Sequence, residues 1–207
     1  DTNKKDEIFV RAKILFSPYS NFNINGTIIS SRLNNGYDVW APDNNDEFIT
    51  FSDAMGEDSQ TLDAFSFKFH YNVIDKFLVT GISSISKVKL IHAYDGDWAN
   101  DEYWLHNHGF DPAIEGWSYS FYDKNERNRN NFTQEFRIST QKYIFGFYYK
   151  KLYEKDIASG YLFGGLGDEA NSRYDFENLA GYFQSDISLN ELLKMSANVR
   201  MEDFSYN

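Results

Sequence analysis

The stretch Leu193-Lys-Met-Ser-Ala-Asn-Val-Arg-Met-Glu202 indicates the fold class of this chain. Every second residue from Leu193 to Met201 is apolar, and the residues between them, from Lys194 to Glu202, are polar. Side chains of a β-strand alternate between the two faces of its sheet, so this segment predicts a strand with one apolar and one polar surface. The same alternation recurs along the chain, which predicts an all-β fold.

About eight such strands are predicted, joined in hairpins by connections that alternate between short turns and long polar loops. The strands are expected near residues 8–17, 22–32, 61–71, 77–94, 131–141, 143–155, 177–189 and 193–202, and the long loops at 33–60, 95–130 and 156–176. No helix is expected. Tight turns on one rim and long loops on the other are typical of an outer-membrane β-barrel. We therefore predict an antiparallel up-and-down meander that is part of a transmembrane β-barrel wall, an order not expected of a Greek-key sandwich.

In such a wall the apolar face meets lipid on the convex side, and the polar face lines the interior on the concave side. The residues expected on the convex side are Phe65, Phe67, Phe69, Phe145, Phe147, Leu193, Met195 and Val199. The charged residues expected to face inward are Arg11, Lys13, Lys68, Lys87, Lys89, Glu135, Arg137, Asp186, Lys194, Arg200 and Glu202.

Composition excludes several classes of protein. The net charge of −11, with Lys and Arg dispersed along the chain, argues against a nucleic-acid partner. The absence of cysteine excludes disulfides and thiolate metal sites. Aromatic residues make up 18% of the chain, more than a soluble core of this size needs, and a membrane barrel places such rings in girdles at the two interfaces.

The beginning of the chain is polar and charged, from Asp1 to Glu7, with no basic segment that leads into an apolar stretch. A secretory signal peptide is therefore not expected there. Many outer-membrane barrels end on an aromatic residue, whereas this chain ends on Asn207. Both observations lead us to expect that the chain is a section of a larger barrel.

Several strands resemble the barrel of TonB-dependent outer-membrane receptors. The segments that resemble strands of this family are Phe132-Thr-Gln-Glu-Phe-Arg-Ile-Ser139, Tyr143-Ile-Phe-Gly-Phe-Tyr-Tyr149, Asn178-Leu-Ala-Gly-Tyr-Phe-Gln184 with 193–202, and Arg11-Ala-Lys-Ile-Leu-Phe-Ser-Pro18. Tyr94-Asp-Gly-Asp-Trp98 with Asn100-Asp-Glu-Tyr-Trp104 is similar to a subset of the family.

The resemblance implies that residues 1–207 are a partial receptor-like β-barrel domain in the outer membrane of a Gram-negative bacterium. It implies a function in binding and importing a scarce nutrient of the iron chelate, cobalamin or glycan class. The family's other partners are a plug domain, the TonB protein and outer-membrane lipid, but the plug and the TonB-binding segment have no counterpart in this sequence. The family's barrel has about 22 strands, far more than are predicted here.

Candidate ligand-binding residues lie in the second long loop, which is expected to be extracellular. They combine aromatic rings with carboxylates, as a sugar- or chelate-binding rim would, and comprise Asp95, Asp97, Trp98, Asp101, Glu102 and Trp104. The alternative for the aromatics, above all for Trp117 and Tyr119, is a membrane-interface girdle. The acidic residues resemble part of a calcium loop, but the twelfth position counted from Asp95 is His106 rather than Glu.

Other chemistry finds little support in the sequence. His106 and His108 supply only two imidazoles, short of the three or four ligands of a transition-metal site. Gly164-Gly-Leu-Gly167 lacks the Lys-Ser/Thr ending of a phosphate loop. No nucleophile lies beside a His and an Asp in a catalytic pattern, so neither an enzyme nor a cofactor is expected. The alternative function is a soluble or secreted all-β module that binds a carbohydrate or another ligand, in which Phe65, Phe67 and Phe69 would be buried.

Overall fold

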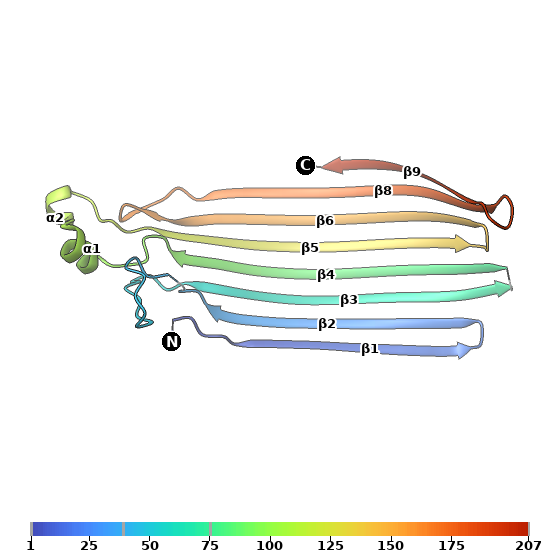
Figure 1. Cartoon of the computed structure of the whole chain (residues 1–207), viewed down its shortest axis with the longest axis horizontal. Coiled ribbons are helices and arrows are strands. Elements are labelled where there is room, and N and C mark those ends of the chain that lie inside the picture. The colour runs from blue at the N-terminus through green and yellow to red at the C-terminus, as the bar shows by residue number, and fades with distance from the viewer. Residues whose placement is uncertain (1, 39, 75, 207) are drawn as a thin grey trace.

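The computed structural model describes residues 2–38, 40–74 and 76–206, and across these residues the chain forms one antiparallel sheet of nine strands (Figure 1). Expectations for Asp1, Asp75 and Asn207 lie outside the described residues. The strands are β1 (Glu7–Tyr19), β2 (Phe22–Gly36), β3 (Glu57–Ile74), β4 (Phe77–Asp95), β5 (Tyr122–Ser139), β6 (Tyr143–Leu162), β7 (Gly165–Leu166), β8 (Ala170–Ser188) and β9 (Lys194–Tyr206).

The strand order is β1-β2-β3-β4-β5-β6-β8-β9, with the two-residue β7 paired to β6 outside this path. Each long strand pairs with its neighbours in sequence, so the prediction of an all-β, up-and-down meander is confirmed. The short turns lie together at one end of the sheet and the long connections at the other (Figure 1). Because β1 and β9 each pair with a single strand, the sheet is open.

The strands continue further toward the loop end than predicted. The prediction of a long loop at 156–176 is wrong, because β6 continues to Leu162 and β8 begins at Ala170. Between these two strands, the short β7 pairs with the end of β6. The first and second loops shrink to residues 37–56 and 96–121. In this half of the sheet both faces carry polar residues, so the alternation that identifies a strand is missing although the backbone ladder continues.

The second loop contains two helices, so the expectation of no helix is wrong. Helix α1 (Asp101–His108) begins after Asn100, whose side chain accepts a hydrogen bond from the Tyr103 N–H at 2.8 Å, and ends at Gly109 in the left-handed region. Helix α2 (Pro112–Glu115) is a single turn. Asparagine at the N-cap and glycine after the last turn are strong local signals, but eight residues give little periodicity to recognise.

Register places most of the large apolar side chains on one face, which we call the apolar face. Residues paired across strands share a face, and Ile28, Phe65, Ile85 and Phe132 form one such row across β2 to β5. Further members of this face are Ile14, Phe67, Phe69, Phe136, Phe145, Phe147, Phe183, Met195 and Val199.

The opposite face, which we call the polar face, carries most of the charges that were expected to point inward. Its members include Arg11, Lys13, Lys68, Glu135, Arg137, Asp186, Lys194, Arg200 and Glu202. The predicted separation of the Phe row from these charges is therefore confirmed. Lys87 and Lys89 are the exceptions: they pair with Asp63 and Thr61, on the apolar face.

The apolar face is apolar only in the half of the sheet near the short turns, which explains where Lys87 and Lys89 lie. On β3 the apolar band runs from Phe65 to Tyr71, about 20 Å at about 3.3 Å per residue. Beyond it the same face carries ion pairs, such as Arg32 with Asp63 at 2.8 Å. The apolar band is therefore bounded along the strands as well as confined to one face.

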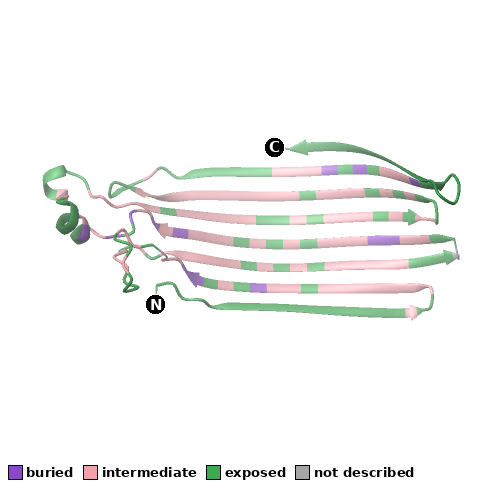
Figure 2. Ribbon diagram, in the orientation of Figure 1, coloured by how far each residue is buried: buried purple, intermediate pink, exposed green. Residues whose placement is uncertain are grey.

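The sheet has no second layer among the described residues. The buried apolar side chains there are Ala93, Ala99, Tyr103 and Ala180, and most strand positions are exposed or half-buried (Figure 2). Among the same residues, no helix is long and apolar enough to cross a membrane. The Phe row consequently lies on an open surface rather than inside a closed core.

Candidate ligand-binding site

The candidate site residues all lie at the loop end of the sheet, where the three long connections meet (Figure 1). Asp95 is the last residue of β4 and is only 4% exposed. Its Oδ1 accepts hydrogen bonds from the N–H groups of Asp97 (3.3 Å) and Trp98 (3.2 Å), and its Oδ2 accepts one from Asp53 (3.1 Å). One carboxylate thus joins the first loop to the second.

Asp97 connects the two ends of the second loop. Its Oδ1 accepts the Phe121 N–H at 3.0 Å, and its Oδ2 accepts the Trp104 Nε1–H at 2.9 Å. Burial raises the pKa of this carboxyl to about 7, and the neighbouring carboxylate of Asp95 adds to the shift. Asp97 and Trp104 therefore hold the loop together, and their polar atoms are occupied within the protein.

Asp101 and Glu102 occupy the first turn of α1 and are exposed. The Ser118 hydroxyl lies 2.9 and 3.0 Å from the two oxygens of Asp101. His106 contacts the Glu102 carbonyl, and no group of three or more His, Asp or Glu side chains among the described residues could hold a metal ion. The structure thus separates these carboxylates rather than gathering them around one point.

The aromatic residues that follow α1 pack on one another. Trp104 lies 4.5 Å from Tyr119 between ring centroids, and Trp117 lies 4.7 Å from Phe110 and 4.9 Å from Phe163 of the third connection. Trp117 and Tyr119 are therefore part of a small aromatic core within the loops, in addition to any contact with a membrane interface.

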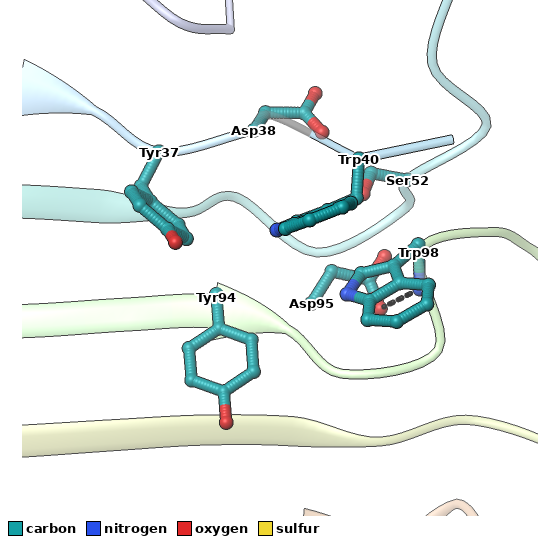
Figure 3. Close-up of a pocket in the computed structure, with 7 residues that line it drawn as sticks. All are labelled: Tyr37, Asp38, Trp40, Ser52, Tyr94, Asp95 and Trp98. Atoms are coloured by element: carbon teal, nitrogen blue, oxygen red, sulfur yellow. Dashed lines mark hydrogen bonds between the residues drawn. The ribbon is translucent and has the colours of Figure 1, made fainter. Parts of the chain in front are cut away.

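A cavity of about 90 Å³ lies between the first two loops, and Trp98 and Asp95 are among its lining residues (Figure 3). The Trp40 and Trp98 rings stack with centroids 5.7 Å apart and planes at 28°. Both rings remain exposed, 59% for Trp40 and 40% for Trp98. The complete lining is Tyr37, Asp38, Trp40, Ser52, Tyr94, Asp95 and Trp98.

Asp38 brings a second carboxylate to this cavity. Its Oδ1 accepts a hydrogen bond from the Thr50 hydroxyl at 2.9 Å, whereas its Oδ2 is buried and has no hydrogen-bond partner among the described residues. No Lys, Arg or His side chain is among the lining residues. The cavity thus combines aromatic surface with negative charge.

Of the six residues predicted for a ligand site, Asp95 and Trp98 line the cavity, and the other four do not. The sequence analysis missed the contribution of the first loop, namely Tyr37, Asp38, Trp40 and Ser52, and that of Tyr94. Trp40, the one tryptophan outside the second loop, was the available signal. No protein-family model matches this chain, and no curated protein matches it either.

Proposed function

We propose that this chain is a section of the wall of an outer-membrane receptor barrel of the TonB-dependent class, which binds and imports a scarce nutrient. The observation that carries the proposal is the apolar band: large apolar side chains are concentrated on one face and in one half of the sheet, although Phe9, Leu15 and Ile82 lie on the polar face. Lipid-facing bands of outer-membrane barrels are about 25 Å tall and are crossed by tilted strands of about 9–11 residues. The seven residues from Phe65 to Tyr71 therefore cover most of such a span.

The exposed side chains of the band support lipid as its surroundings. Phe136 is 43% exposed in mid-sheet, where a soluble protein would cover a Phe row with a second layer. The two polar side chains at the centre of the band, Ser83 and Gln134, hydrogen-bond to each other. This pairing reduces the cost of placing them against hydrocarbon.

The polar face supports a water-filled or protein-filled interior. Tyr182 donates a hydrogen bond to Glu135, and the Arg200 guanidinium lies over the Tyr148 ring at 5.5 Å. These contacts satisfy polar groups across four strands without a covering layer. Glu135, Arg200 and their neighbours are the groups that a plug domain or a passing solute would meet.

The two open edges support the view that this sheet is completed by further strands. A bilayer provides no hydrogen-bond partner for the free backbone groups of β1 and β9, so a spanning sheet must close. The receptor class, its nutrient ligand of the iron chelate, cobalamin or glycan class, and its plug and TonB partners rest on the sequence resemblance.

Single-cysteine variants on β5 test the lipid-facing band directly, because the chain has no native cysteine. Phe136→Cys lies in the band, Arg137→Cys lies next to it on the polar face, and Asn128→Cys shares the face of Phe136 beyond the band. Each variant of the native protein is labelled with a polarity-sensitive fluorophore and reconstituted into bilayers that contain spin-labelled lipid.

We expect blue-shifted emission and strong quenching by the lipid label for the Phe136→Cys probe alone. Comparison with the Arg137→Cys probe shows which face of the sheet meets lipid, and comparison with the Asn128→Cys probe shows how far the lipid contact extends along the strand. The three probes together therefore locate the band. Equal quenching at positions 136 and 137, or no quenching at 136, contradicts the proposal and favours the soluble binding module.

A further inference from the structure

The proposed function leaves open which ligand binds in the loop-end cavity, which Trp40 and Trp98 line together with five other residues. We propose that it binds the head group of a small organic cation, a quaternary or methylated ammonium. This inference rests on the proposed function in one respect, since it takes the loop end as the side from which ligand arrives, and it names a substrate class for that site.

The first argument is the aromatic lining. Tyr37 and Trp40 approach the space from the first loop, and Tyr94 and Trp98 approach it from β4 and the second loop (Figure 3). The negative faces of such rings attract a cation within about 6 Å, and tryptophan is the strongest of them. Several rings around one space form the arrangement that recognises an alkylated ammonium, which cannot satisfy a dense set of hydrogen-bond acceptors.

The second argument is charge. Asp38 and Asp95 place two carboxylates in the lining, and no basic side chain lies there to neutralise them. Backbone N–H groups already occupy both oxygens of Asp95, which fixes its position while leaving its negative charge. The buried Oδ2 of Asp38, which has no hydrogen-bond partner among the described residues, favours a positively charged neighbour over a neutral or anionic one.

The third argument is size. A volume of about 90 Å³ is well below the roughly 300–1,000 Å³ of sites that enclose a whole drug-sized ligand. The cavity therefore takes a group rather than an entire iron chelate or oligosaccharide. The exposed outer surfaces of Trp40 and Trp98 leave the remainder of such a ligand free to extend into solvent.

Backbone conformation adds an independent observation at Trp98. Its φ of 62° lies in the left-handed region, which a bulky residue adopts only at a cost of about 1–2 kcal/mol. The hydrogen bond from its N–H to Asp95 holds this conformation. Strain of this kind is found more often at functional sites than elsewhere.

The test is isothermal titration calorimetry on the purified protein in a polyoxyethylene detergent, which carries neither sugar nor ammonium groups. The ligands are choline chloride, its uncharged isostere 3,3-dimethylbutan-1-ol, and methyl glucoside as a neutral sugar. We expect saturable binding of choline and at least tenfold weaker binding of the isostere and of the sugar.

Variants assign the binding to the cavity. Trp40→Ala and Trp98→Gly each remove one ring, and glycine adopts the left-handed backbone at position 98 without strain, so that variant adds no backbone cost to the loss of the ring. We expect each to weaken choline binding by about threefold to thirtyfold. Trp117→Phe, in the aromatic core outside the cavity, is the matched control and should leave the affinity unchanged.

Equal affinity for choline and its isostere would overturn the inference, as would tighter binding of methyl glucoside or unchanged affinity in both tryptophan variants. The labelled cysteine variants are measured on the same protein. Lipid quenching at position 136 together with absent choline binding refutes the organic-cation site and leaves the proposed barrel intact. The reverse result leaves a cation-binding protein that is not a barrel wall.

Discussion

The two halves of the same strands differ more than any two strands do. Near the short turns, β5 alternates between Phe132, Phe136 and Ile138 on one face and Thr133, Glu135 and Arg137 on the other. Toward the loops the same strand reads Tyr-Asp-Lys-Asn-Glu-Arg-Asn-Arg-Asn-Asn, polar on both faces, while its ladder to β4 and β6 is unbroken. Backbone pairing determines the shape of the sheet, and the side chains determine which surroundings, apolar or aqueous, each half of the sheet can have.

The largest predicted effect on the difference between the two halves comes from a charge placed in the apolar band. Phe136→Arg should destabilise the protein in a bilayer by about 2–4 kcal/mol, because the guanidinium would face hydrocarbon. Asn128→Arg, on the same strand and face beyond the band, should change stability by less than about 0.5 kcal/mol. Reversible urea unfolding in liposomes measures both variants. A similar loss in the two would mean that the band does not face lipid.

The second predicted difference between the two halves is the pH dependence of their stability. The loop half is held together by the carboxyl group of Asp97, whereas the described residues of the apolar band include no titratable group in such a role. The pKa of Asp97 is raised to about 7 by burial and by Asp95, and burial also raises that of Asp53. The folded loop therefore binds protons more tightly than the unfolded chain does. The contribution of this protonation to the stability of the loop is fully present below about pH 4, and it is lost as the pH rises from there to about 7.

Hydrogen exchange of the 96–121 amides at pH 5 and pH 8 measures this effect, after correction for intrinsic exchange rates. We expect faster opening of the loop at pH 8, with no such change in the amides of β5 within the band. Asp97→Asn should remove most of the pH dependence, although it deprives Trp104 of its carboxylate acceptor. A loop that is most stable at pH 8 would contradict the direction of the pKa shift.

The smallest predicted effect concerns the helix that sequence analysis missed. Asn100→Ala removes the side-chain acceptor for the Tyr103 N–H and should destabilise α1 by about 1 kcal/mol. Limited proteolysis between residues 100 and 110 should become faster, while the strands remain protected. Asn107→Ala is a less informative control, since it loses a hydrogen bond to the Tyr103 carbonyl. Unchanged cleavage in Asn100→Ala would show that packing of Trp104, rather than the cap, holds the helix.

The sequence predicts the half of the sheet in which the two faces have different surroundings. Phe65 and Lys68 could be assigned to opposite faces because alternation marks any strand between an apolar and an aqueous medium. The polar extensions of β5 and β6, and the correct face of Lys87, could not be read in this way, since both faces there carry polar groups. Register with Asp63 and Asn130 determines the position of Lys87.

The candidate site divides along a similar line. Asp95 and Trp98 were identified because they lie close together in one acidic, aromatic loop. Trp40 lies more than fifty residues earlier, and only the pairing of β2, β3 and β4 brings its loop beside that of Trp98. The sequence likewise gives no indication that Asp97 and Trp104 would be occupied by each other.

The unequal lengths of the connections also affect the order in which the sheet forms. A two-residue turn at Ser20-Asn21 joins β1 to β2, whereas residues 37–56 separate β2 from β3. Each doubling of a loop adds about 0.6 kcal/mol to the entropy cost of closing it, so the long connection costs about 2 kcal/mol more. Hairpins should nucleate at their turns and zip toward the opposite rim. The cavity lined by Trp40 and Trp98 would then assemble last, and mutations in its loops would slow the early steps of folding little.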